Sequence, residues 1–248
     1  MKRLLAAFIF FTRLPFWRIA TVPSECFKHV VPYWPVVGWL TGGVLAGILW
    51  LLAQVLPIQM AWIGAIVIRL LVTGCLHEDG LADFCDGFGG GTTRERTLAI
   101  MKDSHIGTYG VVGLILYFLL WIQMGTVIPL ATLCAMAFCV DVYAKWCVSH
   151  IVNLLPYARK EEESKAKVTY SRMTGAESLI GIVAGGIPLM FLLPAGLGWA
   201  CLCPPIVFLL LCGWMKRRIG GYTGDCCGAA FLLCELSFYI GVMVVLWK

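Results

Sequence analysis

Long hydrophobic runs with almost no charge alternate with short polar segments along this chain. The hydrophobic runs lie at residues 30–56, 58–76, 104–140, 178–215 and 226–247. One membrane crossing needs about 20 apolar residues, so the third and fourth runs can each hold two crossings, the third with its second helix continuing through Asp141 and Lys145. The pattern therefore predicts an all-α, polytopic integral membrane bundle of about seven transmembrane helices, with short cytoplasmic helices between them.

The polar segments carry nearly all of the basic residues. They cover residues 1–29, 77–107, 150–176 and 216–225. Membrane proteins keep Lys and Arg on the cytoplasmic side, so this distribution places all four segments in the cytoplasm and the C-terminus outside. We interpret 1–29 as an interfacial segment rather than a signal peptide, because its apolar core is short and no Ala-x-Ala site follows. No repeat or linker divides the chain, so 1–248 is expected to be one membrane domain.

Composition agrees with this class of protein. The chain is 60% hydrophobic and 13% charged, and its mean hydropathy is +0.86, far more apolar than a soluble domain. The net charge of +5 does not indicate a nucleic-acid partner, because the basic residues are dispersed between the spans. Most of the 12 cysteines lie singly in apolar runs, where we expect reduced packing residues rather than disulfides or a zinc site. Membrane lipid is the expected surroundings, and a homo-oligomer is compatible with the sequence.

The segment 77–91 holds four of the 14 acidic residues. A helix of about 3.6 residues per turn would align Asp79, Asp83 and Asp86 on one face, at i, i+4 and i+7. Three carboxylates on one face repel one another unless a cation neutralises them. Carboxylate oxygens suit Mg²⁺, Mn²⁺ or Ca²⁺ better than zinc. The sequence therefore predicts a divalent metal site held by these three residues at the cytoplasmic face.

Basic residues follow the acidic motif on the same predicted face. Thr92 and Glu95 form a capping-box pattern, which predicts a short helix through about Asp103 that ends near Gly107. In phosphoryl transfer a metal and basic side chains hold the phosphate oxygens together. We therefore expect Lys102, Arg159 and the 216–218 cluster, which begins at Lys216, to contact substrate phosphates.

Several polar residues admit two interpretations. Gly221 and Thr223 lie in a glycine-rich segment before a predicted helix, which either offers N–H groups to an anion or forms a tight turn. Asp225 either acts in the site or caps that helix. His77 is a general base, a ligand, or a polar residue at a helix start.

Ionisable residues also occur inside the spans. Asp141 and Glu235 are functional candidates by default, with Arg69 and Lys145 as alternative structural partners. We favour pairing for Asp141 and leave Glu235 open. Trp and Tyr residues near the span ends are expected to anchor the chain at the membrane interface.

Three separated motifs resemble those of the cobalamin 5′-phosphate synthase family, the adenosylcobinamide-GDP ribazoletransferases. They are His77-Glu-Asp-Gly-Leu-Ala-Asp-Phe-Cys-Asp-Gly, Ile100-Met-Lys-Asp-Ser-His-Ile-Gly-Thr-Tyr-Gly and Gly220-Gly-Tyr-Thr-Gly-Asp-Cys-Cys-Gly-Ala. The resemblance runs from Thr12 to the last span. Lys145 departs from it, since an Arg is expected there.

The resemblance implies an enzyme of the bacterial or archaeal membrane. Such an enzyme joins α-ribazole, or its 5′-phosphate, to adenosylcobinamide-GDP and releases GMP, using Mg²⁺. It implies catalytic roles for Asp79, Asp83, Asp86, Asp225 and His77, in an active site facing the cytoplasm. The competing interpretations are a cation-coupled transporter, which would use acids near the bilayer midplane, and a structural membrane adaptor, which gives no reason for three aligned carboxylates.

Overall fold

The computed structural model describes residues 1–159 and 169–246, and these residues form helices and short 3₁₀ turns without a β-strand. Residues 160–168, the centre of the predicted charged loop, lie outside the described residues. The principal helices are α1 (Lys2–Phe11), α2 (Trp34–Leu52), α3 (Ile58–Thr73), α4 (Leu76–Gly90), α5 (Arg94–Lys102), α6 (Thr108–Val127), α7 (Leu130–Ser149), α8 (Ile151–Leu154), α9 (Gly175–Leu192), α10 (Cys203–Ile219) and α11 (Gly224–Leu246). Short 3₁₀ turns follow α1 at Phe16–Arg18, Ser24–His29 and Val31–Tyr33, and another precedes α10 at Ala195–Leu202.

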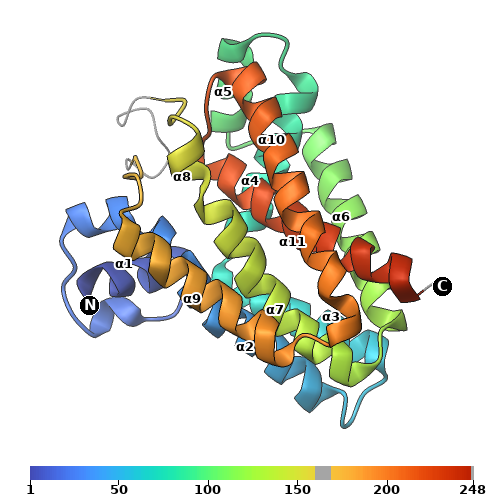
Figure 1. The fold of residues 1–248 in the computed structure, drawn as a ribbon. Coiled ribbons are helices and arrows are strands. Elements are labelled where there is room, and N and C mark those ends of the chain that lie inside the picture. Colours follow the sequence, from blue (N-terminus) through green and yellow to red (C-terminus); the bar gives the residue numbers. More distant parts are fainter. Residues whose placement is uncertain (160–168, 247–248) are drawn as a thin grey trace.

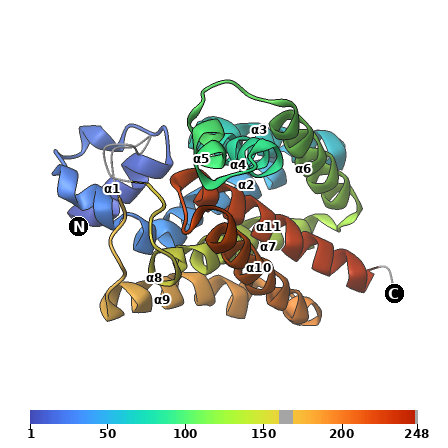
Figure 2. The ribbon, with the colours of Figure 1, turned by 90° about the horizontal axis from the view of Figure 1, so that it is seen from above.

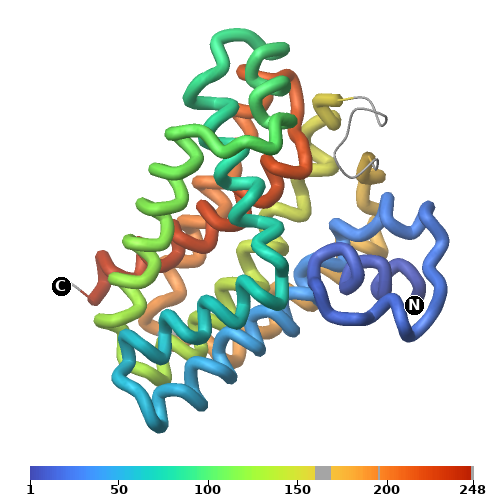
Figure 3. The backbone as a smooth tube through the Cα atoms, turned by 180° about the vertical axis from the view of Figure 1, so that it is seen from behind, coloured from blue at the N-terminus to red at the C-terminus, as the bar shows by residue number. Residues whose placement is uncertain are grey.

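Six helices are long and apolar enough to cross a membrane, and the bent pair α3–α4 makes a seventh crossing if it is counted as one span. The prediction of a polytopic bundle with about seven spans is confirmed. The second span is not the straight helix that the hydrophobic pattern predicts, because the axes of α3 and α4 differ by 89°. Figure 3 shows this turn where the chain passes from α3 into α4.

Two consecutive left-handed residues make the bend. Gly74 has φ 64° and Cys75 has φ 56°, a conformation that glycine adopts freely and cysteine only at a steric cost. A Cβ atom at Gly74 would collide with the side chain of Arg13, whose backbone N–H donates to the Val72 carbonyl at 2.7 Å. The N-terminal segment therefore packs against the outside of the corner.

The helices pack closely where glycines remove side chains from the contact. A Cβ at Gly38 of α2 would lie 2.9 Å from Val142 Cα of α7, and one at Gly42 would lie 2.9 Å from the Phe138 carbonyl oxygen. Helix α9 covers another side of α7, and α10 and α6 flank α11. In Figure 1, α2, α7 and α9 run together toward the lower right of the molecule, below α4 and α5.

The polar loops meet at one end of the bundle. Arg94, at the start of α5, donates to the carbonyl oxygens of Ile219 and Ala158, at 2.8 Å each. Tyr157 and Tyr222 form an isolated parallel bridge. The turns α2–α3, α6–α7 and α9–α10 lie at the opposite end in Figure 1. This separation of the two sets of connections agrees with the alternation that the sequence predicts.

The N-terminal segment stands to one side of the bundle, as the view from above shows (Figure 2). It is tied down by the ion pair between Arg3 and Glu177 at 2.8 Å and by a hydrogen bond from the Ser171 N–H to the Lys28 carbonyl at 2.8 Å. The expected N-terminal helix is present as α1 and ends at Thr12, whose hydroxyl donates to the Phe8 carbonyl at 2.7 Å.

The structure tests the predicted cap of α5 and the predicted state of the cysteines. The helix after the acidic motif is capped by Thr93, whose hydroxyl accepts from the Arg96 N–H at 3.2 Å, so the predicted cap at Thr92 is wrong by one residue. The complete capping box lies instead at the start of α9, between Thr174 and Glu177. All 12 cysteines are free thiols, as predicted.

Candidate functional site

Helix α4 carries the acidic motif, as predicted. Its first turn contains Glu78 and Asp79, where negative charge is favourable at a helix N-terminus. The carboxylate face does not lie in open solvent: Asp79 is exposed, but Asp83 and Asp86 retain only 8% and 7% of their accessible surface. The motif is therefore built into the bundle and is not a loose cytoplasmic loop.

The first and third motifs cross where α4 packs on α11. A Cβ at Gly80 would lie 2.9 Å from the Asp225 carbonyl oxygen, and one at Gly228 would lie 3.0 Å from the His77 carbonyl oxygen. A glycine on each helix thus permits backbone contact. This close approach brings Asp79 and Asp225, which are distant in sequence, to the wall of one cavity.

Thr223, not Asp225, caps α11. The Thr223 hydroxyl accepts from the Cys226 N–H at 3.3 Å, and Thr223 is fully buried. Asp225 lies in the first turn of α11 and lines the cavity. Of the two interpretations of Asp225 drawn from the sequence, the structure favours a place in the site.

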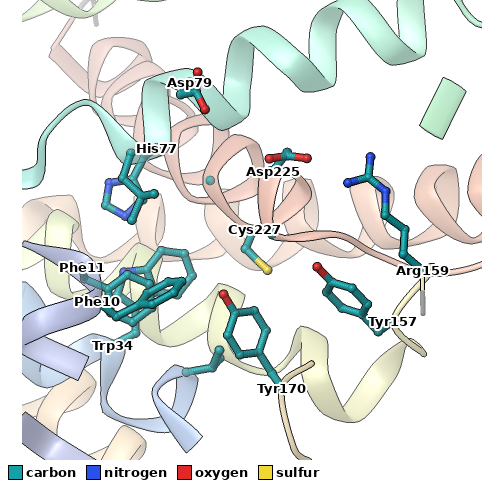
Figure 4. Close-up of a pocket in the computed structure, with 14 residues that line it drawn as sticks. Phe10, Phe11, Trp34, His77, Asp79, Tyr157, Arg159, Tyr170, Asp225 and Cys227 are labelled. Carbon is teal, nitrogen blue, oxygen red and sulfur yellow. The ribbon is translucent and has the colours of Figure 1, made fainter. Parts of the chain in front are cut away.

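The cavity has a volume of about 300 Å³ and a polar and an aromatic side. Asp79, Asp225 and Arg159 form the polar side, and Figure 4 shows Asp225 between the other two in projection. The aromatic side chains come from the N-terminal segment, the start of α2, the segment after α8 and the segment before α9: Phe10, Phe11, Trp34, Tyr157 and Tyr170. Burial raises the pKa of the Tyr170 phenol well above its ordinary value, so this hydroxyl is a neutral hydrogen-bond donor.

Asp86 has a structural task in this conformation. Its two carboxylate oxygens accept from the backbone N–H groups of Gly107 and Gly110, at 2.7 Å and 2.8 Å. These donors lie at the start of α6, so Asp86 satisfies N–H groups that have no partner inside the helix. It does not line the cavity that holds Asp79 and Asp225.

Across residues 1–159 and 169–246, no three His, Cys, Asp or Glu side chains are grouped closely enough to hold a metal ion. A complete protein cage is not what Mg²⁺ needs, since it is commonly held by one or two carboxylates while substrate phosphates and water complete its octahedron. Asp79 and Asp225 on the cavity wall, with Asp83 one turn along α4 from Asp79, supply oxygen donors of that kind.

His77 is buried among aromatic rings. Its ring stacks on Trp34 with centroids 5.5 Å apart and meets the edge of Phe231 at 4.8 Å. Its Nε2 atom is buried without a hydrogen-bond partner among the described residues, although the residue also lines the cavity. The packing supports the structural interpretation of His77.

The ionisable residues inside the spans form one buried network. Arg69 Nη1 lies 2.6 Å from Glu235 Oε1 and 3.4 Å from Asp141 Oδ2, and Lys145 pairs with Asp141. Tyr117 adds a hydrogen bond to Glu235 at 3.0 Å. The expected pairing of Asp141 is confirmed, and Glu235 also has a cationic partner. An acid that is paired in this way does not resemble a vacant ion site of a transporter.

The predicted phosphate-binding residues do not all lie at the cavity. Arg159 lines the cavity and donates from Nη2 to the Leu98 carbonyl at 2.8 Å. Lys102 and Arg159 share a second, more open depression beside α5. Lys216 is exposed on the last turn of α10 and does not line the cavity.

The glycine cluster before α11 shapes the backbone. Gly220 ends α10 with φ 73°, and a Cβ at Gly221 would collide with the Pro156 carbonyl oxygen. The Tyr222 N–H donates to this same oxygen at 3.0 Å. These contacts support the tight-turn interpretation of Gly220 and Gly221.

The aromatic wall was not foreseen from the sequence. Trp34 is 1% exposed and stacks on Phe11, with ring centroids 5.0 Å apart and planes 7° apart. The expectation that aromatic residues near span ends anchor the membrane interface is therefore wrong for Trp34. A usable signal was present in the dense aromatic composition of residues 8–17, before the first span.

Comparison with known proteins identifies the family. A family model described as cobalamin-5-phosphate synthase matches residues 3–243. Proteins named adenosylcobinamide-GDP ribazoletransferase are similar along nearly their whole length. The one from Leptothrix cholodnii is 36% identical over 96% of this chain and 93% of its own. The one from Shewanella amazonensis is 35% identical over 100% of this chain and 96% of its own. No solved structure matches. Because the family model covers residues 3–243 and these relatives match nearly the whole chain, this chain belongs to the cobalamin-5-phosphate synthase family.

Proposed function

We propose that this protein is an adenosylcobinamide-GDP ribazoletransferase, which joins α-ribazole or α-ribazole 5′-phosphate to adenosylcobinamide-GDP and releases GMP at the last stage of cobalamin synthesis. The observation that carries the proposal is the convergence of Asp79 from the first motif, Asp225 from the last motif and Arg159 on one cavity. Acidic and basic groups are the combination that phosphoryl transfer requires.

Mg²⁺ fits the oxygen donors of this site. Asp79 and Asp225 would hold it, with Asp83 as the neighbouring acid on α4, and the substrate pyrophosphate and water would supply the other ligands. When bound, the ion would neutralise charge that develops on the phosphate oxygens. We assign Asp86 to the start of α6 rather than to the first set of ligands, because both its oxygens already accept backbone hydrogen bonds.

The residues of this chain can then take the following roles. A ribose hydroxyl of the ribazole attacks the phosphorus that is attached to cobinamide, a new P–O bond forms, and the bond from this phosphorus to GMP breaks. The hydroxyl proton passes to a carboxylate, for which Asp225 is placed at the cavity wall. Arg159, held by its hydrogen bond to Leu98, faces phosphate oxygens.

The same reasoning gives the location. We place the cavity at the cytoplasmic side of the bacterial inner membrane, because the segments that surround it contain most of the basic residues. Substrates that carry nucleotides and phosphates are charged and occur on that side.

The deciding experiment uses the purified protein in detergent or vesicles. Adenosylcobinamide-GDP and α-ribazole 5′-phosphate are mixed with it, and GMP release is followed while Mg²⁺ is varied. Activity is expected only with both substrates and Mg²⁺, and Asp79→Asn or Asp225→Asn should lower kcat by at least about 10²-fold if these carboxylates act in the transition state. Turnover near that of the wild type in both variants would contradict the proposal.

A further inference from the structure

The cavity has two walls of different chemistry, and this division bears on which substrate it accepts. Figure 4 shows Phe10, Phe11 and Trp34 together on one side, Tyr157 and Tyr170 on another, and the acidic side chains near the top. Val31 and Leu76 complete the apolar lining. A planar apolar ring system would pack against the aromatic side, and its polar substituents would face the acidic side chains and Arg159.

The aromatic walls are fixed before any ligand binds. Phe11 stacks on Trp34, and Trp34 in turn lies against Phe231, with centroids 5.7 Å apart. Phe10 and Tyr170 meet edge to face at 6.1 Å, and Tyr170 meets Tyr157 in the same way at 6.4 Å. Side chains that hold one another in place lose little entropy when a ring binds against them.

Size excludes the larger substrate. A volume of about 300 Å³ is at the lower end for small-molecule pockets, and a corrinoid macrocycle with its side chains and nucleotide does not fit in it. The corrinoid can only present its phosphates at the mouth. Two planar groups remain as candidates for the interior, which are the base of the ribazole and the guanine of the nucleotide.

The lining distinguishes these two bases. Guanine has several hydrogen-bonding groups along its edge, and burying them against phenyl and indole rings without partners is unfavourable. Phe10, Phe11 and Trp34 form this side of the cavity with aromatic rings. A benzimidazole base is largely apolar and therefore suits such a surface better than guanine does.

We propose that this cavity is the ribazole subsite, in which the benzimidazole base packs against the aromatic side where Phe10 meets Tyr170, with its ribose directed to Asp79 and Asp225 and its 5′-phosphate to Arg159. The inference rests on the proposed function and adds the assignment of one substrate to one cavity. Phe10 and Tyr170 become residues that determine specificity, and the N-terminal segment becomes part of the active site.

The test measures binding separately from turnover. α-Ribazole 5′-phosphate is titrated calorimetrically into the purified wild-type protein without corrinoid, and then into Phe10→Leu and Tyr170→Leu. Loss of one stacking partner should weaken binding roughly tenfold. In steady-state assays the KM for α-ribazole 5′-phosphate should rise similarly, while the KM for adenosylcobinamide-GDP stays within about twofold.

Two further variants control for folding. Tyr170→Phe retains the ring and should lose clearly less affinity than Tyr170→Leu. Phe191→Leu removes a phenyl ring that is 76% exposed at the end of α9 and does not line the cavity. This variant should change neither the Kd nor the KM for α-ribazole 5′-phosphate.

Three outcomes would overturn the assignment. A raised KM for adenosylcobinamide-GDP alone would place guanine in the cavity. Unchanged constants in both leucine variants would show that the walls do not contact the base. Equal loss of binding in Tyr170→Phe and Tyr170→Leu would remove stacking as the cause. Failure of the proposed function is distinct, because the wild-type protein would then release no GMP whether or not it bound α-ribazole 5′-phosphate.

Discussion

Replacing Arg69 by methionine should destabilise the bundle more than any other single change in the buried network. Arg69 is 2% exposed, and both Glu235 and Asp141 are 0% exposed. Its guanidinium is also stacked over Trp121, with Cζ 4.3 Å from the ring centroid. Arg69→Met removes one of two cations while all the carboxylates stay buried. Removing one partner of a buried pair typically costs about 3–5 kcal/mol.

Glu235→Gln provides the matched comparison. Glutamine keeps an oxygen that accepts from Arg69, and Arg69 keeps Asp141 at 3.4 Å and Glu78 at 3.8 Å. The expected loss is therefore no more than about 1.5 kcal/mol, the lower end for a hydrogen bond to a charged group. The double variant Arg69→Met/Glu235→Met should be more stable than Arg69→Met alone, because the carboxylate that lost its partner is also removed.

The stability of each variant can be measured by titrating the purified protein in mixed micelles with dodecyl sulfate. Cys139, Cys226 and Cys234 are buried free thiols, so their reaction with a maleimide dye reports opening of the bundle. The reasoning is refuted if Arg69→Met costs no more than Glu235→Gln, or if the double variant is no more stable than Arg69→Met.

Three other predictions follow from contacts around the site. Asp86→Ala should cost about 1–3 kcal/mol in the same titration, because it leaves two N–H groups at the start of α6 without an acceptor; a loss of activity at unchanged stability would instead indicate a metal ligand. Gly80→Ala should lower kcat by about 10²-fold by separating α4 from α11, whereas Gly213→Ala, where an added Cβ meets nothing within 4 Å, should be neutral, and equal effects would contradict the close approach. Reporter fusions should place Thr93 and Gly220 in the cytoplasm and Pro57, Gly125 and Leu197 outside, and the opposite result at Gly220 would overturn the assigned orientation.

Helices and their order could be predicted because hydrophobic runs and prolines determine them locally. The turn between α6 and α7, at residues 128–129, divides the run 104–140 that is predicted to hold two crossings. The acidic helix could be placed because its spacing is a property of the helix itself. The pairing of Asp141 could be expected because an unpaired charge inside a span is unfavourable.

Features that depend on contacts between distant segments could not be predicted. The hydrophobic pattern continues smoothly through Gly74 and Cys75, so it contains no sign of an 89° bend. Asp86 has the same helical face and charge as its neighbours, and only the arrival of Gly107 and Gly110 makes its position structural. The aromatic wall requires Phe11 to meet Trp34 across a turn whose path the sequence does not define.

The bend between α3 and α4 also constrains how the protein is made. Helix α3 has 16 residues, fewer than the about 20 that a span needs, and α4 carries four acids that the translocon would reject at roughly 2.5–3.5 kcal/mol each near a helix centre. This pair is therefore unsuited to stepwise release into lipid as it leaves the ribosome. Arg69 meets Glu235 only when α11 has been synthesised. We expect α3 and α4 to reach their final positions late, so that the cavity forms only after the last helix has been inserted.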